Sequence, residues 1–313
     1  MNEFARTLAQ RVEGHVELRR SLGYSFCNQT ATLRAFVRYV ESHRFDGPLT
    51  QAIALEFVLS AEVTGSVRAR RYAILRRFAE YFAMYDSRTQ LLDPRALPRS
   101  RTVPSPRILN DEELRSLISA ARTVSPRRAQ RGRTLETLIG LLASTGLRSG
   151  EALRLDRADV DLVEGILQVR RTKFRKDRQV PVHPTMLAVL RDYARARDSA
   201  FPLPKCPAFF VSLRGNRLSS SALYTALREA CSLTGVNENA SRALRPHDLR
   251  HRFAVARLAA WHRHNCDVQA LLPLLATYLG HTRYSDTAYY ITGTAELLGL
   301  AANHAFGEQG GAA

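Results

Sequence analysis

The stretch Leu141-Leu-Ala-Ser-Thr-Gly-Leu-Arg-Ser-Gly-Glu-Ala-Leu-Arg-Leu155 decides how this chain is read. Thr145-Gly146 breaks one helical pattern and Ser149 can begin another, which predicts a junction of two packed helices at Arg148. An arginine held there can be presented rigidly to a ligand. Taken alone, the stretch would better fit an ordinary surface arginine in a loop.

A second segment, Leu244-Arg-Pro-His-Asp-Leu-Arg-His-Arg-Phe-Ala254, carries further donors. If a helix begins after Pro246, His247 and Arg250 are spaced i and i+3 and lie on one face, where both can reach the same phosphate. Asp248 of this segment, like Glu151 of the first, either orients basic neighbours or serves the structure.

A third segment, Tyr278-Leu-Gly-His-Thr-Arg-Tyr-Ser-Asp-Thr-Ala-Tyr-Tyr-Ile291, lies near the C-terminus. Gly280 can end the preceding helix and expose His281 at the turn. Tyr290 follows a few residues later. Tyr289 and Tyr290 together would also fit an aromatic pair in a core.

A fourth segment reads as a β-hairpin. Two β-prone runs, 165–171 and 179–182, flank the basic turn Lys173-Phe-Arg-Lys-Asp177. A lysine in such a loop can swing into a site and give a proton to a leaving alkoxide. Lys173 is the candidate, and Lys176 is its rival.

The rest of the chain predicts a mainly helical protein with a small sheet. Residues 1–96 show four helical patterns, with apolar stripes that include Leu8 and Val12, Leu33 and Phe36, then Ala52, Leu55, Val58 and Leu59. A Pro- and Arg-rich linker follows at 97–107, and Asn110 with Glu113 then predicts a capped helix start. Residues 108–304 form a mixed domain, with helices at 111–122, 134–144 and from Ser219 onward and a strand at 209–211. Residues 305–313 form a tail.

The fourth helical pattern, Ser66 to Tyr85, is rich in arginine, which suits DNA phosphates or merely a solvated face. The candidate DNA-contacting residues are Arg68, Arg70, Arg71, Arg76, Arg77, Arg101, Arg175 and Lys176.

The charge of the chain points to a polyanionic partner. The 313 residues include 46 Lys and Arg against 29 Asp and Glu, for a formal net charge of +17. The segment Met1–Gln10 lacks the apolar run of a signal peptide, and the longest apolar stretch, 270–279, contains Pro273. We therefore expect a cytoplasmic, nucleoid-associated protein without a membrane partner.

No metal or cofactor is expected. His262, His264 and Cys266 do not share one helix face, and the cysteines form no CxxC pair. The sequence also contains no GxxxxGK[ST] loop and no carboxylate cluster for two metal ions.

In their order along the chain and in their amino-acid sequences, the four segments resemble the conserved motifs of the tyrosine recombinases, the family of phage integrases and Xer-type recombinases. Thr145–Glu151 is similar to the first-arginine box, Thr172–Val182 to the lysine hairpin, and His247–His251 to the HxLRH box. Leu279–His281 resembles the LGH box, and Thr287–Tyr290 the tyrosine box. Arg175 stands where the family usually has a small residue. The run Arg19-Arg-Ser-Leu-Gly-Tyr24 resembles the opening of some transposon-borne members.

The resemblance implies a catalytic set of Arg148, Lys173, His247, Arg250, His281 and Tyr290. In this family the tyrosine attacks a scissile phosphodiester, forming a 3′-phosphotyrosine and freeing a 5′-hydroxyl. The implied fold is a helical core-binding domain and a mixed catalytic domain that form a C-shaped clamp on duplex DNA. The implied partners are double-stranded DNA and further protomers, in a tetrameric synapse or a hetero-assembly with related recombinases. The expected process is DNA integration, excision or transposition.

Two other classes remain as alternatives. A type IB topoisomerase has similar chemistry, although the sequences of the HxLRH and LGH boxes favour a recombinase. A catalytically silent DNA-binding paralogue would not need the nucleophile Tyr290.

Overall fold

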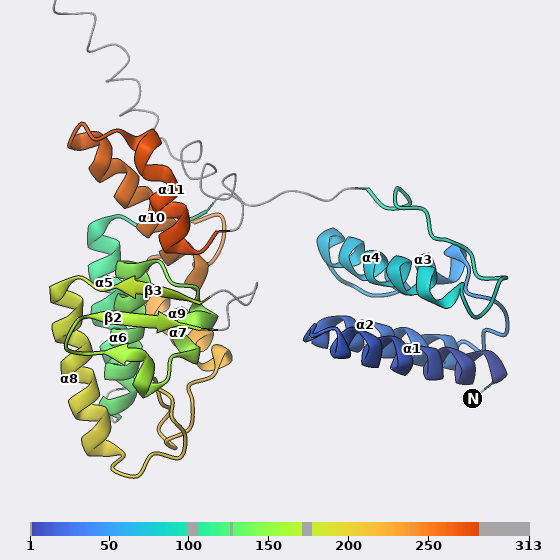
Figure 1. Ribbon diagram of the computed structural model, residues 1–313, viewed down its shortest axis with the longest axis horizontal. Coiled ribbons are helices and arrows are strands. Elements are labelled where there is room, and N and C mark those ends of the chain that lie inside the picture. Colours follow the sequence, from blue (N-terminus) through green and yellow to red (C-terminus); the bar gives the residue numbers. More distant parts are fainter. Residues whose placement is uncertain (1, 99–105, 126–127, 171–176, 239, 282–313) are drawn as a thin grey trace, which may run out of the picture. The chain divides into compact units, whose positions relative to one another are not determined.

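The computed structural model describes residues 2–98, 106–125, 128–170, 177–238 and 240–281 (Figure 1). The chain forms two compact units, residues 1–104 and 105–313. Its described residues are mainly helical with one small sheet, as the sequence predicts.

The first unit consists of helices joined by short loops. Their bounds are α1 Glu3–Ser21, α2 Cys27–Ser42, α3 Gln51–Leu59 and α4 Gly65–Phe82. Asn2 caps α1 by accepting from the N–H of Ala5 at 2.8 Å, and Thr50 caps α3 in the same way through Ile53. The four predicted helices are therefore present.

The core of this unit is built from one apolar face of each helix. The predicted stripes of α1 and α2 are buried at Leu8, Val12, Leu33 and Phe36. The stripe predicted for α3 was right at Val58, which is buried, but wrong at Leu59, which is 51% exposed; the other buried residues of this helix are Ala54 and Phe57. Nearly every position of this short helix is apolar, so periodicity alone could not identify its inner face.

The second unit contains a larger set of helices. Their bounds are α5 Asp111–Thr123, α6 Ala129–Thr145, α7 Ser149–Arg154, α8 Pro184–Ala200, α9 Ser220–Thr234, α10 Pro246–Arg263 and α11 Val268–Leu279, with a 3-10 turn at Arg157–Asp159. The predicted capping box at the start of α5 is confirmed, since Asn110 accepts from the N–H of Glu113 at 2.8 Å and Glu113 reaches back to that of Asn110 at 2.9 Å. Helix α8 was not predicted, although Pro184 opens it and Met186, Leu190 and Tyr193 repeat on its buried side.

The sheet has three antiparallel strands in the order β1 (Val160–Asp161), β2 (Ile166–Val169) and β3 (Arg178–Pro181). Leu167 pairs with Val180, and both are buried. Both hairpin strands are therefore present: the first is shorter than the predicted 165–171, and the second begins one residue before the predicted 179–182. A strand at 209–211 was predicted wrongly, because that segment forms only isolated bridges and buries Phe209 and Phe210 instead.

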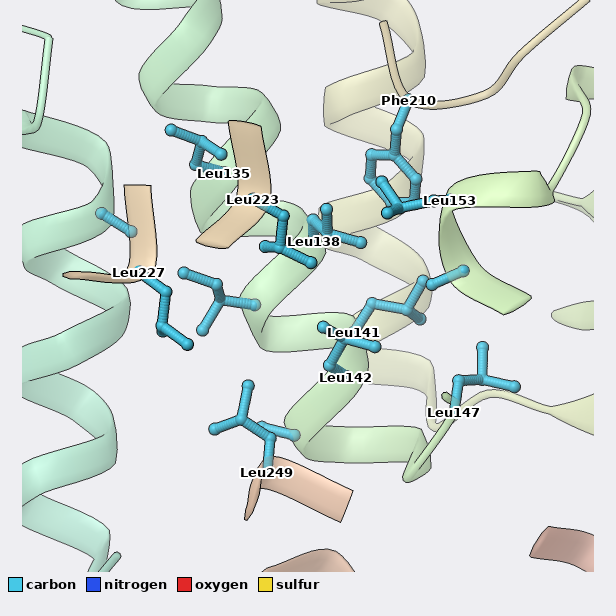
Figure 2. Close-up of a cluster of buried hydrophobic side chains, with 14 of the residues drawn as sticks. Leu135, Leu138, Leu141, Leu142, Leu147, Leu153, Phe210, Leu223, Leu227 and Leu249 are labelled. Carbon is cyan, nitrogen blue, oxygen red and sulfur yellow. The ribbon is translucent and has the colours of Figure 1, made fainter. Parts of the chain in front are cut away.

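Helix α6 lies at the centre of the second unit. Figure 2 shows its leucines facing Leu223 and Leu227 of α9 and Leu249 of α10. The buried residues of α6 run from Gly132 to Thr145, so packing fixes its C-terminal end. Helices α10 and α11 pack together at one end of the unit through a smaller cluster that includes Phe253 and Leu279 (Figure 1).

Candidate active site

Arg148 lies where two helices meet, as predicted. Helix α6 ends at Thr145, and Gly146 follows with a φ of 63°, in the left-handed region that commonly ends helices. A Cβ atom at Gly146 would lie 2.6 Å from Cδ1 of Phe253, so a larger residue would displace the core. Arg148 directly precedes α7, and its side chain is 31% exposed.

Arg250 is fully buried in α10 and is bonded to the ends of two other helices. Its Nη1 donates to the carbonyl of Gly146 at 2.8 Å, and its Nη2 donates to that of Leu279 at 2.8 Å. The last carbonyls of a helix lack partners within it and carry partial negative charge. They therefore compensate a buried guanidinium.

His281 follows the turn that ends α11. Gly280 adopts a φ of 68° there, as predicted, and its carbonyl accepts from Nη2 of Arg148 at 3.2 Å. Nη2 of Arg250 lies 2.7 Å from Nε2 of His281. Because a guanidinium only donates, Nε2 accepts and the neutral ring carries its proton on Nδ1. Arg148, Arg250 and His281 thus gather around the C-termini of α6 and α11.

Glu151 is a buried carboxylate that joins Arg148 to an arginine that the sequence analysis did not single out. It accepts from Nη1 of Arg148 at 2.8 Å and from the N–H of Arg148 at 3.1 Å. Arg178 at the start of β3 reaches the same carboxylate with Nη1 at 3.2 Å and Nη2 at 2.8 Å. Burial alone would raise the pKa of Glu151, but Arg178 and Arg148 outweigh it and lower the pKa to about 2.

His247 lies at the start of α10, which begins at Pro246 as predicted. In contrast to Arg250 it is exposed, and its ring meets that of His251 edge-on, with centroids 4.6 Å apart. Desolvation by its neighbours, and then the charge of Arg250, lower the pKa of His247. The ring is therefore neutral near pH 7, and it can accept a proton.

Burial also keeps two other histidines neutral. Burial first, and then Arg250 and Arg148, lower the pKa of His281 to about 3. Burial first, and then His247, lower the pKa of His251 to about 4. Cationic histidine would be repelled by the arginines, so the positive charge of the site resides on the guanidinium groups.

Asp248 is a buried anion at the beginning of α10. It accepts from both terminal nitrogens of Arg242 at 2.7 Å and from the N–H of Arg245 at 2.8 Å. Burial would raise its pKa, but these bonds outweigh that effect and lower it. Asp248 therefore fixes the helix start from which Arg250 projects.

The remaining candidate residues lie outside the described residues. They are Lys173, Tyr290, Arg101, Arg175 and Lys176. Of the catalytic set inferred from the sequence, the structure brings Arg148, Arg250 and His281 together and places His247 on the same helix as Arg250.

The arginines of α4 do not share one environment. Arg70 and Arg77 are exposed. Arg68 donates to the carbonyl of Ala61 at 3.3 Å, and Arg76 pairs with Glu80 at 3.2 Å. Arg71 is half-buried. Within the first unit, Arg70 and Arg77 are therefore the arginines of α4 best placed to meet a polyanion.

These two arginines line a groove of about 750 Å³ between α1, α2 and α4. Arg19 of α1 and the exposed Tyr24 line it too. The groove also borders the first turn of α2, whose N-cap residue, Phe26, makes no side-chain capping bond. A helix N-terminus beside arginines favours phosphate groups.

Within the described part of the chain, no helix is both long and apolar enough to cross a membrane. In that same part, His, Cys, Asp and Glu side chains form no group of three or more that could hold a metal ion.

Comparisons with known proteins agree with this geometry. Residues 107–296 match the phage integrase family. A putative integrase/recombinase, y4rE of Sinorhizobium fredii (strain NBRC 101917 / NGR234), is 57% identical over 312 residues, covering 100% of both chains. Tyrosine recombinase XerA of Thermococcus kodakarensis (strain ATCC BAA-918 / JCM 12380 / KOD1) is 29% identical over 272 residues, covering 85% of this chain and 86% of that one.

The fold has a solved counterpart as well. The XerH site-specific recombinase, in a post-cleavage complex with a palindromic difH substrate, superposes with a TM-score of 0.66 at 20% sequence identity. The match covers 88% of this chain and 78% of that chain.

Fold, site and comparisons together define a tyrosine-type site-specific recombinase. The chain belongs to the phage integrase family.

Proposed function

We propose that this recombinase cleaves and rejoins DNA strands through a covalent 3′-phosphotyrosine bond formed by Tyr290. The observation that carries the proposal is the gathering of Arg148, Arg250 and His281 around the C-termini of α6 and α11. Three hydrogen-bond donors so close together suit the oxygens of a single phosphate.

The proposed step is a transesterification. The phenol oxygen of Tyr290 attacks phosphorus, and the new P–O bond forms as the bond to the 5′-oxygen breaks. Lys173 gives a proton to that leaving oxygen, while His247, neutral and exposed, orients the phenol or accepts its proton. Attack by a 5′-hydroxyl reverses the step and reseals a strand.

Negative charge grows on the non-bridging oxygens as phosphorus becomes five-coordinate. Arg148 and Arg250 are the proposed electrostatic partners of this charge, and His281 supplies a further donor. Their bonds to helix ends and to Glu151 hold the groups in place before substrate arrives. One such preorganised donor is typically worth ~3–4 kcal/mol of transition-state stabilisation.

The proposed substrate is double-stranded DNA, bound by both units. We assign residues 1–96 to a core-binding domain, 97–107 to a basic linker and 108–304 to the catalytic domain. Arg70 and Arg77, with Arg19, are the phosphate contacts that the first unit supports best. Arg101, Arg175 and Lys176 are proposed contacts of the linker and the hairpin.

The active form is proposed to be an assembly of protomers on two DNA segments. A tetramer of this chain or a hetero-assembly with related recombinases would meet the need for four strand cleavages. Recombination between two sites, as opposed to relaxation of supercoils in one DNA molecule, distinguishes this function from that of a topoisomerase.

Covalent trapping tests the proposal. The full chain is mixed with a nicked suicide substrate taken from the ends of its host element, and denaturant-stable adducts are counted for wild type, Tyr290→Phe and Tyr289→Phe. We expect adducts from wild type and Tyr289→Phe and none from Tyr290→Phe. An adduct that persists in Tyr290→Phe would refute the assigned nucleophile, and tight binding without any adduct would favour a catalytically silent DNA-binding protein.

A further inference from the structure

Arg178 connects three elements at the edge of the candidate site. It begins β3, its Nε donates to the carbonyl of Tyr278 in α11 at 2.9 Å, and both of its Nη atoms reach Glu151 in α7. The side chain is only 13% exposed. Its Nε and both of its Nη atoms thus bond to protein groups.

The carboxylate held by Arg178 is the same one that holds Arg148. The side chain of Glu151 is 2% exposed and accepts from Nη1 of Arg148 at 2.8 Å. A buried carboxylate stays ionised only when cations and hydrogen bonds compensate for lost hydration. Arg178 supplies part of this compensation through two hydrogen bonds to Glu151. The ionised state of Glu151, and with it the bond that holds Arg148, therefore depends on Arg178.

Gly280 indicates independently that the place of Arg178 is closely defined. A Cβ atom at Gly280 would lie 2.8 Å from Nη1 and 3.0 Å from Cζ of Arg178, so the guanidinium rests directly against this turn. The same turn offers the carbonyl of Leu279 to Arg250 and that of Gly280 to Arg148. It also leads into His281.

We propose that Arg178 is a positioning residue for strand cleavage, which fixes Arg148 through Glu151 and supports the turn that presents His281. The inference rests on the proposed function and adds to it a residue that does not touch DNA. Arg178 also begins the strand that follows Lys173 in the sequence. One side chain therefore connects that strand to Arg148 and to the turn before His281.

Replacement of Arg178 should make cleavage sensitive to acid. In Arg178→Ala only Arg148 remains to stabilise the Glu151 carboxylate, and burial then raises its pKa. Glu151 takes up a proton as the pH falls, and Arg148 loses its anchor. We expect suicide-substrate cleavage to fall about 100-fold at neutral pH, as for a small misplacement of a catalytic group, and to fall further toward pH 5.5. DNA affinity should remain unchanged.

Three further variants separate positioning from a general loss of structure. Arg252→Ala is the matched control, because Arg252 is also 13% exposed and also binds one carbonyl and one carboxylate, those of Leu109 and Asp111. It should cleave at the wild-type rate. Arg178→Lys should recover only part of the rate, since an ammonium group cannot reach both oxygens and the Tyr278 carbonyl. Arg178→Ala combined with Glu151→Gln should lose the acid sensitivity, because the titrating group is gone.

The second measurement does not need activity. Side-chain ¹³C-labelled glutamate in the full chain, with Glu151 assigned by Glu151→Gln, reports the carboxyl titration by NMR. We expect Glu151 to titrate at higher pH in Arg178→Ala than in wild type. An unchanged titration, or a pH–rate profile parallel to that of wild type, would overturn the role of Arg178 alone. A wild-type chain that forms no Tyr290 adduct would overturn the proposed function instead.

Discussion

Replacing Gly146 with alanine tests how closely the end of α6 is packed against the helices that hold Arg250. The residue has a φ of 63°, and a Cβ atom would approach Cδ1 of Phe253 to 2.6 Å and Cδ2 of Leu279 to 2.9 Å. Both side chains belong to the buried cluster between α10 and α11. The substitution therefore strains the backbone and overfills the core together.

The magnitude follows from these two effects. A non-glycine residue in the left-handed region costs about 1–2 kcal/mol. Overpacking of a well-filled core costs about 1–3 kcal/mol. We expect Gly146→Ala to lower the free energy of unfolding by about 2–5 kcal/mol.

A second glycine supplies the control. Gly235 ends α9 with a φ of 65°, but a Cβ there meets only the side chain of the exposed Glu238, at 3.0 Å. Gly235→Ala should therefore show the backbone effect alone, about 1–2 kcal/mol. The difference between the two variants isolates the contact with Phe253 and Leu279.

The assay is urea unfolding of the full chain followed by tryptophan fluorescence. The sequence has a single tryptophan, Trp261, which packs against the same α10 and α11 cluster, so its signal reports the second unit. Equal losses of stability in Gly146→Ala and Gly235→Ala would refute the packing argument. If the argument holds, Gly146→Ala should also impair cleavage, because the Gly146 carbonyl binds Arg250.

Two further predictions concern the first unit. Burial lowers the pKa of His15 to about 4. Below pH 6.5 the unfolded chain therefore binds a proton at His15 that the folded chain does not bind, and the free energy of unfolding falls between pH 6.5 and about 4. His15→Leu should flatten that decline in amide hydrogen exchange of α1 and α4, and parallel profiles for the two proteins would contradict it. In DNA titrations over a range of salt concentrations, Arg70→Ala and Arg77→Ala should each reduce the salt slope by about 1, whereas Arg76→Ala, whose guanidinium pairs with Glu80, should leave it nearly unchanged. Equal slopes in all three variants would argue against the groove as a phosphate site.

Local signals were sufficient to predict the helix ends that frame the site. Asn110 and Glu113 mark a helix start, and Gly146 and Gly280 mark two helix ends, because capping chemistry depends only on neighbours in sequence. The positions of Arg148 and His281 beside those ends followed directly. Helix α8 was not predicted, even though Pro184 begins it. The apolar segment 209–211 was predicted as a strand but is a buried loop.

The support of the site could not be predicted in the same way. Arg178, Glu151 and the carbonyl of Tyr278 are brought together from β3, α7 and α11, so their contact depends on tertiary packing. In sequence, Arg178 is simply one more cation in a basic hairpin. The inner face of α3 was also misjudged, because apolar residues cover most of that helix and only its packing selects Phe57 over Leu59.

The main-chain carbonyls that bind Arg148 and Arg250 affect which parts of this enzyme mutation can change. A mutation can exchange a side chain, but it cannot remove the carbonyl of Gly146, Leu279 or Gly280. Side chains elsewhere on this chain can therefore change by mutation while Arg148 and Arg250 keep these main-chain partners.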